Sequence, residues 1–257
     1  MKRIVPVLLA ALLLTGLLSG CSTSKETEIS VFAAASLTET LQTIKEAYEK
    51  EHPGVTIVYT FDSSGTLKTQ IQEGAECDLF LSASPKQIKE LGDLLEGTPT
   101  ELLENKVALA VPEGNPAGIR SFDDLMQRLR EGTVLLAIGS SDVPVGQYTL
   151  KILSHYGIDP QDPAIAACLT FGSNVKEVTT QVSQTVVDCG IIYATDAFSA
   201  GLDTVDTATA EMCGQVIYPA ALLKNSQNRE AAQAFLEYLT GEDAAQVFRS
   251  VGFRPMN

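Results

Sequence analysis

The sequence predicts an α/β protein with two lobes, each a mostly parallel β-sheet flanked by helices, and with a ligand cleft between the lobes. Two features of the chain support this prediction. Apolar, strand-like runs alternate with amphipathic, helix-like segments, an order that favours parallel strands joined by right-handed crossovers. The alternation occurs in two rounds of similar size, and 257 residues suffice for two cores.

The first round contains three strand–helix pairs and a fourth strand. Its segments are 28–34, 37–52, 55–61, 65–74, 77–83, 84–95 and 105–114. The second round alternates likewise and ends in a long strand and a helical C-terminus. Its segments are 122–132, 134–139, 147–157, 168–172, 174–184, 189–197, 215–224 and 228–253. The last strand and helices are expected to cross back, so that lobe 1 spans 28–107 plus 217–257 and lobe 2 spans 108–216. Such a double crossing forms a hinge beside the cleft.

Residues 1–20 have the pattern of an export signal. A basic start precedes an apolar run that is shorter than the roughly 20 residues of a membrane-spanning helix, and small residues precede Cys21. The sequence "LSGC" at 18–21 resembles the bacterial lipobox, which implies a lipoprotein signal peptide over 1–20 and a lipid on Cys21. A plain signal peptide with a chance cysteine is the alternative. The polar segment 21–27 suits a lipidated tether, which places the domain on an extracytoplasmic membrane face.

The charge of the chain excludes one class of partner. The formal net charge is −14, and removal of residues 1–20 leaves 16 basic against 32 acidic residues. Nucleic-acid binding needs a basic stripe, and none is visible. An anionic ligand must therefore be held by local dipoles and hydrogen bonds.

The cysteines indicate no zinc site. Apart from Cys21, the chain contains Cys77, Cys168, Cys189 and Cys213. Their scattered spacing has no C-x-x-C pattern, and an extracytoplasmic location permits disulfides without specifying a pairing.

Five joins between a strand and the next helix carry small or polar residues. They lie at 33–37, 61–67, 138–149, 171–178 and 191–197. In a parallel sheet the carboxyl ends of the strands and the amino ends of the following helices share one edge, so unpaired N–H groups and helix dipoles converge there. This arrangement predicts an anion site without cationic side chains. Each join taken singly is also typical of an ordinary helix cap.

The first join allows both interpretations. Ser36 and Glu39 fit the S-x-x-E capping box, in which the serine oxygen accepts a hydrogen bond from the backbone of the first helical turn. The three alanines at 33–35 indicate either close helix–sheet packing or the approach of a ligand to the backbone. Lys68 and Lys176 lie near other joins and are interpreted as parts of solvated helix faces.

Six segments together resemble the molybdate-binding proteins of molybdate ABC importers, which have the type II periplasmic-binding-protein fold. These segments are "VFAAASL", "SSGTL", "GAECDLFLSAS", "VPVGQYT", "GIIYATDA" and "VFRSVGF". The resemblance runs from about Ile29 to Arg254. It implies a monomeric, cofactor-free protein that captures molybdate or tungstate and delivers it to the transmembrane subunits of a permease.

The resemblance also implies which residues bind the oxyanion. The expected ligands are three hydroxyls and three backbone amides, one of which is the amide of Ser36 itself, with no direct ligand to a metal cation. They belong to Ser36, Ser64, Tyr193, Val145 and Val175. Ser63 is the competing choice for the second serine, and Gly65 stands where a serine is common in the family.

Three alternatives accompany this interpretation. Sulfate and phosphate are also tetrahedral. Phosphate at neutral pH carries a proton and needs a hydrogen-bond acceptor, which Asp62 and Asp142 near the joins can supply, so phosphate is disfavoured rather than ruled out. A serine hydrolase is disfavoured because the chain lacks a G-x-S-x-G elbow and because His52 and His155 are expected at the surface. A binder of organic solutes is disfavoured because tryptophan is absent and arginine is scarce near the joins. The sequence thus favours a binding protein over an enzyme.

Overall fold

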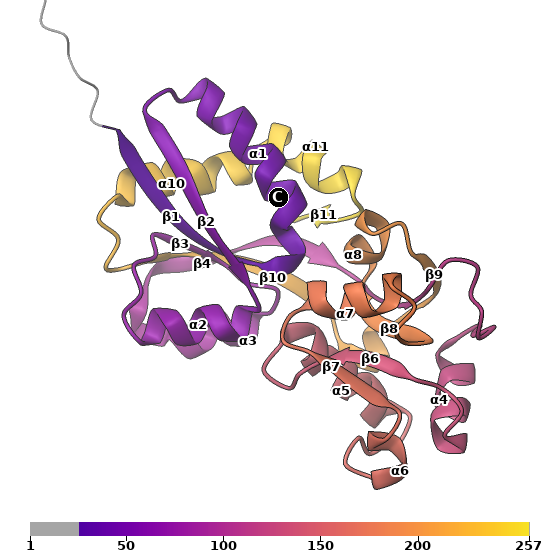
Figure 1. The fold of residues 1–257 in the computed structure, drawn as a ribbon. Helices are drawn as coiled ribbons and strands as arrows, with labels where there is room; N and C mark the ends of the chain where they lie inside the picture. The colour runs from indigo at the N-terminus through magenta and orange to yellow at the C-terminus, as the bar shows by residue number, and fades with distance from the viewer. Residues whose placement is uncertain (1–25, 257) are drawn as a thin grey trace, which may run out of the picture.

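A computed structural model describes residues 26–256 of the chain, and Figure 1 shows its fold. The strands are β1 Thr27–Ala34, β2 Val55–Asp62, β3 Leu79–Leu81, β4 Leu95–Asn105, β5 Val107–Val111, β6 Leu136–Gly139, β7 Leu169–Gly172, β8 Cys189–Tyr193, β9 Asp203–Thr207, β10 Val216–Leu223 and β11 Arg254–Pro255. The helices are α1 Thr38–Glu51, α2 Ser64–Gln72, α3 Pro85–Leu91, α4 Phe122–Glu131, α5 Pro144–His155, α6 Pro163–Ala166, α7 Val175–Ser183, α8 Ala194–Ser199, α9 Ala210–Cys213, α10 Arg229–Leu239 and α11 Glu242–Ser250. Two 3-10 turns are η1 Ala35–Leu37 and η2 Gly92–Leu94.

The strands form two sheets, in the orders β11-β4-β10-β3-β1-β2 and β7-β6-β8-β5-β9. Strands β2, β1 and β3 run parallel, as do β7, β6 and β8. The remaining pairs, which involve β4, β5, β9, β10 and β11, are antiparallel. The α/β fold with two helix-flanked sheets is therefore confirmed, but each sheet is mixed, whereas the sequence predicted mostly parallel strands.

The long strand β4 explains much of this difference, because it has no counterpart among the predicted segments. Its sequence "LEGTPTELLEN" contains a glycine, a proline and three glutamates, and most of its residues are at least partly exposed. An antiparallel strand can face water on one side, so it needs no continuous apolar run. The pattern that marks the buried strands is therefore absent from β4.

The chain crosses between the sheets twice. Strand β4 of the first sheet ends at Asn105 and β5 of the second begins at Val107, while α9 ends at Cys213 and β10 returns to the first sheet at Val216. Asn105 and Val216 are paired in register, so the two crossings lie side by side. Val107 lies on β5 of the second sheet, and Val216 lies on β10 of the first sheet. Lobe 2 was expected to span 108–216, so each crossing comes one residue earlier than expected.

Helices cover both faces of the first sheet. Figure 1 shows α1 and α10 on one face and α2 and α3 on the other. Successive residues of a strand point to opposite faces, and β1 follows this rule: Val31 packs in the core beneath α1 and α10, whereas Phe32 packs with residues of α2 and α3. Both faces of β1 are therefore buried, which explains its unbroken apolar sequence.

Three structural results concern cysteines, metals and membranes. The four cysteines at positions 77, 168, 189 and 213 are buried free thiols, so the described chain contains no disulfide, and burial raises the pKa of Cys77 to about 12. Within residues 26–256, no helix has the length and apolarity needed to cross a membrane, and no cluster of His, Cys, Asp or Glu suits a metal ion. The predicted signal peptide at 1–20 and the predicted lipid site Cys21 lie outside the described residues.

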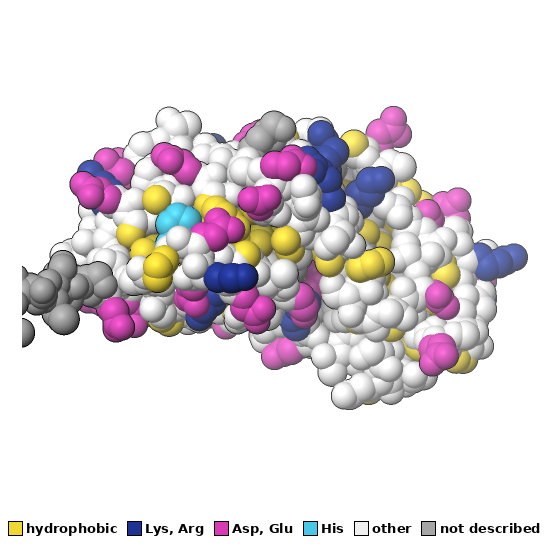
Figure 2. Space-filling view, turned by 90° about the horizontal axis from the view of Figure 1, so that it is seen from above, with side chains coloured by type: hydrophobic (Ala, Val, Ile, Leu, Met, Phe, Trp, Pro, Cys, Tyr) yellow, Lys and Arg dark blue, Asp and Glu magenta, His cyan; other side chains and the backbone are white. Residues whose placement is uncertain are grey.

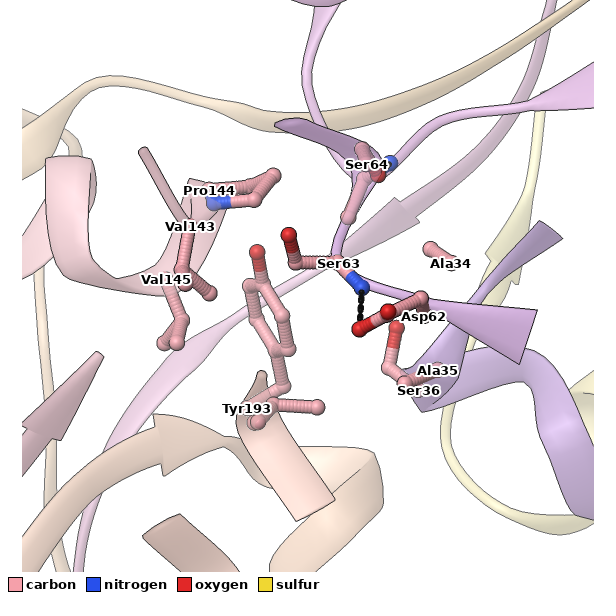
Figure 3. A pocket seen from close by; sticks show the side chains of 12 residues that line it. Ala34, Ala35, Ser36, Asp62, Ser63, Ser64, Val143, Pro144, Val145 and Tyr193 are labelled. Carbon is pink, nitrogen blue, oxygen red and sulfur yellow. Dashed lines mark hydrogen bonds between the residues drawn. The ribbon is translucent and has the colours of Figure 1, made fainter. Parts of the chain in front are cut away.

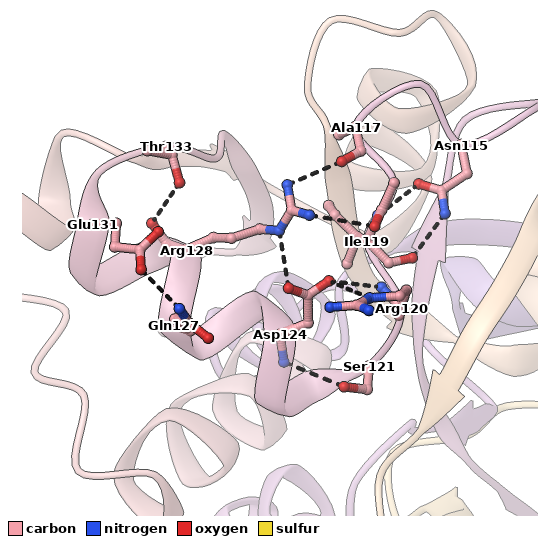
Figure 4. Close-up of polar contacts among 11 residues, drawn as sticks. Asn115, Ala117, Ile119, Arg120, Ser121, Asp124, Gln127, Arg128, Glu131 and Thr133 are labelled. Carbon is pink, nitrogen blue, oxygen red and sulfur yellow. Dashed lines mark hydrogen bonds and ion pairs between the residues drawn. The ribbon is translucent and has the colours of Figure 1, made fainter.

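Charged side chains lie mainly on the surface, where acidic and basic groups are interspersed on the face shown in Figure 2. One charged group also fixes a loop (Figure 4). Arg128 on α4 donates through Nη1 to the carbonyl of Ala117 at 2.9 Å, through Nη2 to that of Gly118 at 3.3 Å, and through Nε to Asp124 at 3.1 Å. These hydrogen bonds join α4 to the loop after β5.

Candidate functional site

A pocket lies where the parallel strands of both sheets end and their helices begin (Figure 3). It is lined by Ala34, Ala35, Ser36, Asp62, Ser63, Ser64, Ala83, Val143, Pro144, Val145, Val175 and Tyr193. The space inside it that a water-sized sphere can occupy is about 10 Å³, room for roughly one water molecule. Pockets for drug-sized organic ligands measure roughly 300–1,000 Å³, so this pocket suits a small solute.

Two helices of the second lobe begin at the pocket. Helix α5 begins at Pro144, and α7 begins at Val175 after its N-cap Asn174, whose side chain accepts a hydrogen bond from the N–H of Glu177. The first N–H groups of a helix have no partner within the helix. The N–H groups of Val145 and Val175 are such groups, and the positive ends of the two helix dipoles add to their attraction for an anion.

Gly146 allows α5 to begin close to the end of β6. A Cβ atom at this position would lie 2.2 Å from the carbonyl oxygen of Ser140 and 2.3 Å from that of Gly139. Any side chain would push the helix away from the strand. Glycine therefore places the first turn of α5, including the N–H of Val145, at the rim of the sheet.

Ser63 and Ser64 both line the pocket but have different partners. Ser63 is the N-cap of α2, and its Oγ accepts a hydrogen bond from the N–H of Thr66 at 3.1 Å and lies 2.9 Å from Thr66 Oγ1. Ser64 is fully buried, and its Oγ accepts a hydrogen bond from the N–H of Ala83 at 2.9 Å. The hydroxyl proton of Ser64 is therefore left for another acceptor, whereas Ser63 is engaged in capping.

The capping box predicted at Ser36 is wrong. Ser36 lies inside the 3-10 turn η1, and α1 begins after Leu37 without a side-chain cap. Its Oγ lies 3.0 Å from Tyr218 Oη on β10, and Glu39 forms an ion pair with Lys176. Tyr218 and Lys176 are far from Ser36 and Glu39 in the sequence. The local S-x-x-E motif therefore could not show that these two contacts take the place of the capping box. The alanines that precede Ser36 are buried and two of them line the pocket, as expected for a close approach to the backbone.

Tyr193 contributes a buried hydroxyl without a partner. Its Oη is shielded from solvent and has no hydrogen-bond partner of good geometry among residues 26–256, although the nearby Tyr218 hydroxyl adds to the rise in its pKa, and Figure 3 shows the Tyr193 hydroxyl pointing into the pocket. Leaving such a group unpaired costs about 1–3 kcal/mol. Burial raises the pKa of Tyr193 well above its usual value, so the hydroxyl keeps its proton at neutral pH and acts as a donor.

Asp62 is the only charged residue in the pocket lining, and the lining contains no cationic side chain. Its Oδ1 accepts hydrogen bonds from the N–H of Ser63 at 2.7 Å and from Nδ2 of Asn174 at 3.3 Å. The second bond joins the two lobes. Two donors thus offset the negative charge of Asp62 beside the pocket.

The sequence predicted that Lys176 lies on a solvated helix face, and the structure shows instead that it is paired with two carboxylates. Its Nζ lies 2.8 and 2.9 Å from the two carboxylate oxygens of Glu39 and 3.0 Å from Oδ1 of the buried Asp196. Burial of Asp196 creates a need for a nearby cation, which the sequence pattern did not show. Lys68 is also paired, with Glu90 at 2.9 Å.

The structure brings the predicted ligand residues together and adds others. Ser36, Ser64, Val145, Val175 and Tyr193 all line this one pocket, as does Ser63. His52 and His155 are exposed and do not line it. Sequence reasoning missed Ala83, which carries no signal, and Tyr218, whose only signal is a polar hydroxyl within an apolar strand segment.

Comparison with known proteins identifies the family of the chain. Residues 29–254 match the family model for the bacterial extracellular solute-binding proteins. The chain belongs to this family. This solute-binding protein is 32% identical to a putative ABC transporter substrate-binding lipoprotein of Bacillus subtilis, with 96% of each chain covered. It is 33% identical to the molybdate-binding protein of Escherichia coli, again with 96% of each chain covered. The solved substrate-binding domain of a putative molybdenum ABC transporter from Clostridium difficile is similar to this solute-binding protein, with a TM-score of 0.66, 30% identity, and coverage of 90% of this chain and 100% of that one.

Proposed function

We propose that this solute-binding protein captures molybdate or tungstate and, as a monomer anchored through a lipid on Cys21, delivers it to the transmembrane subunits of an ABC permease. One observation carries the proposal: the buried hydroxyl of Tyr193 has no partner and points into a small pocket whose lining has no cation. The similarity to molybdate-binding relatives supports this choice of ligand. Binding and release need no cofactor and no catalytic group.

Neutral donors are sufficient for this task. The proposed donors are the hydroxyls of Ser36, Ser64 and Tyr193 and the amides of Val145 and Val175. A hydrogen bond to a charged partner contributes roughly 1.5–3 kcal/mol, so five such bonds supply on the order of 10 kcal/mol. Sub-micromolar binding needs more than about 8 kcal/mol.

Calorimetric titration of the purified protein with molybdate, tungstate, sulfate and phosphate tests the proposal. Molybdate and tungstate should bind with similar affinity, because they share shape, charge and size, and both should bind more tightly than sulfate. Tightest binding to sulfate or phosphate would refute the assignment.

Asp62 favours a second candidate, a protonated oxyanion such as hydrogen phosphate, since its carboxylate lines the pocket and can accept a hydrogen bond from the O–H group of that anion. Asp62→Asn distinguishes the two candidates. If phosphate is the ligand, this variant loses affinity because the acceptor for the phosphate proton is gone. If molybdate is the ligand, the variant binds at least as tightly as the wild type, because a negative charge beside the anion has been removed.

Substitution of the two proposed serine ligands tests the site itself. Ser36→Ala and Ser64→Ala should each weaken binding by about tenfold or more, which corresponds to the loss of one charged hydrogen bond. Ser63→Ala is the matched control: it removes the cap of α2 and should lower the free energy of unfolding by about 1 kcal/mol, with a smaller loss of affinity. Unchanged affinity in both Ser36→Ala and Ser64→Ala would place the site elsewhere.

A further inference from the structure

Ser36 is the end of a buried chain of hydrogen bonds that begins where the chain crosses between the sheets. Ser36 Oγ lies 3.0 Å from Tyr218 Oη, and Nδ2 of Asn105 lies 3.3 Å from the same Tyr218 oxygen. Nδ2 of Asn105 also donates to Thr195 Oγ1 at 2.9 Å. All four side chains are buried. Among them, only Ser36 lines the pocket.

Asn105 determines the direction of these hydrogen bonds. Its Oδ1 accepts a hydrogen bond from the N–H of Lys106 at 2.8 Å. The opposite orientation of the amide would place Nδ2 against that N–H, two donors facing each other, and is therefore excluded. Because an amide nitrogen only donates, Tyr218 Oη accepts from Asn105. Burial raises the pKa of Tyr218 well above its usual value, so Tyr218 keeps its single proton. Its other hydrogen bond among the described residues is the one to Ser36 Oγ, so we assign the proton to that bond.

We propose that Asn105 and Tyr218 are positioning residues that make Ser36 a hydrogen-bond donor to the bound anion. This inference rests on the function proposed above. Ser36 Oγ accepts a hydrogen bond from Tyr218 Oη, so the hydroxyl proton of Ser36 is free to point into the pocket. Ser64 is arranged in the same way, because its Oγ accepts the N–H of Ala83 at 2.9 Å. Both serines therefore donate to the anion, which favours oxyanions that carry no proton.

The placement of the two positioning residues has a structural consequence. Asn105 is the last residue of β4 and Tyr218 lies on β10, the two strands through which the chain passes between the lobes. Thr195, the other partner of Asn105, lies on α8 of the second lobe. The orientation of the Ser36 hydroxyl is thus set by the segment that joins the lobes.

Two variants with little change in shape test the proposal. Tyr218→Phe removes the hydroxyl and keeps the ring, which packs edge-to-face on Tyr193 and Phe253 at centroid distances of 5.6 and 5.3 Å. The Kd of this variant for molybdate should rise about tenfold. Its affinity for phosphate should increase relative to its affinity for sulfate, because Ser36 Oγ becomes able to accept a hydrogen bond from the O–H group of hydrogen phosphate. Asn105→Asp should also raise the Kd about tenfold, because its carboxylate accepts a hydrogen bond from Tyr218 Oη, and Tyr218 Oη then accepts one from Ser36 instead of donating to it.

The matched control is Tyr59→Phe, which removes another tyrosine hydroxyl outside the pocket. Tyr59 Oη donates to the carbonyl of Leu41 at 3.1 Å, and Tyr59 does not line the pocket. This variant should bind with the Kd of the wild type. A rise in Kd as large as that of Tyr218→Phe would show that any lost tyrosine hydroxyl weakens binding and would overturn the proposal.

A double-mutant cycle separates positioning from a general structural effect. In the Ser36→Ala background, Tyr218→Phe should change the Kd by less than twofold, because the group that it orients is absent. If Tyr218→Phe lowers the affinity equally in the wild type and in Ser36→Ala, or does not lower it in the wild type, the proposal is overturned. A wild type that prefers sulfate or phosphate refutes only the molybdate assignment, and the cycle is then run with the preferred anion. A wild type that binds none of the four anions overturns both.

Discussion

The polar residues of the pocket reach it in three different ways. Ser36 lies in a 3-10 turn, Ser64 is the first residue of a helix, and Tyr193 is the last residue of a strand. The helix-start residues Ser64, Val145 and Val175 were predictable, because a helix N-terminus is marked by neighbouring residues along the chain. The partner of Ser36 was not, because Tyr218 is 182 positions away.

Tyr193 leads to a prediction that separates stability from binding. Tyr193→Phe removes a buried hydroxyl that has no partner in the free protein, so the free energy of unfolding should rise by about 1 kcal/mol. The affinity for molybdate should fall at least tenfold, because one donor to the anion is lost. Urea unfolding without ligand and calorimetric titration measure the two effects. Loss of stability in the ligand-free variant would indicate that the hydroxyl has a partner after all.

At the scale of elements, the start of α2 in one lobe touches the turn before α5 in the other. A Cβ atom at Gly65 would lie 2.3 Å from the backbone carbonyl oxygen of Asp142. Backbone atoms cannot move aside as a flexible side chain can, so only glycine permits this approach of the lobes. The departure from the serine common in the family therefore has a geometric role here, which the sequence could not assign.

Gly65→Ala should hold the lobes apart and weaken anion binding by at least tenfold. The donors of α2 and those of α5 would then no longer reach one anion together, although each lobe keeps its own core. Calorimetry measures the affinity, and small-angle scattering of the ligand-saturated protein should show a larger radius of gyration than for the wild type. Wild-type affinity in this variant would mean that the contact is not part of the bound state.

At the scale of the whole molecule, one ion cluster joins the lobes beside the pocket. Lys176 on α7 is paired with Glu39 on α1 and with Asp196 on α8, at 2.8 and 3.0 Å. Asp196 is fully buried, and burial raises its pKa to about 6, although the ammonium of Lys176 acts in the opposite direction. The charge of Asp196 therefore costs stability at neutral pH.

This raised pKa predicts a pH dependence. The folded protein binds the Asp196 proton more tightly than the unfolded chain does, so the contribution of Asp196 to the free energy of unfolding falls as the pH rises through about 6. Asp196→Asn does not titrate. The free energy of unfolding of this variant minus that of the wild type should therefore increase, by on the order of 2 kcal/mol between about pH 4 and 7.

Urea titrations at several pH values measure this difference, and Asp203→Asn, at an exposed position, is the control that should show little change. A difference for Asp196→Asn that stays flat, or that decreases with pH, would contradict the assignment. Such a result would mean that Lys176 compensates the buried carboxylate fully.

The sequence by itself determined the alternation of strands and helices, the resemblance to a family, and the strand–helix joins whose residues line the pocket. These features depend on contacts within a few positions: apolar periodicity defines the buried strands, and small or polar residues mark the helix starts whose N–H groups remain free. The joins could therefore be located before the structure was known, and the family resemblance implied Ser64, Val145, Val175 and Tyr193 as the ligands within them.

Only the tertiary structure decided the mixed sheets, the partner of Ser36 and the position of Lys176. Strand β4 pairs antiparallel with β10, Ser36 meets Tyr218 across 182 positions, and Lys176 meets Glu39 across 137. Such contacts depend on how distant strands are ordered and set in register, and the residues next to each partner carry no trace of that order. Hydrogen-bond direction and buried charge, which govern specificity and pH response, therefore follow from the fold.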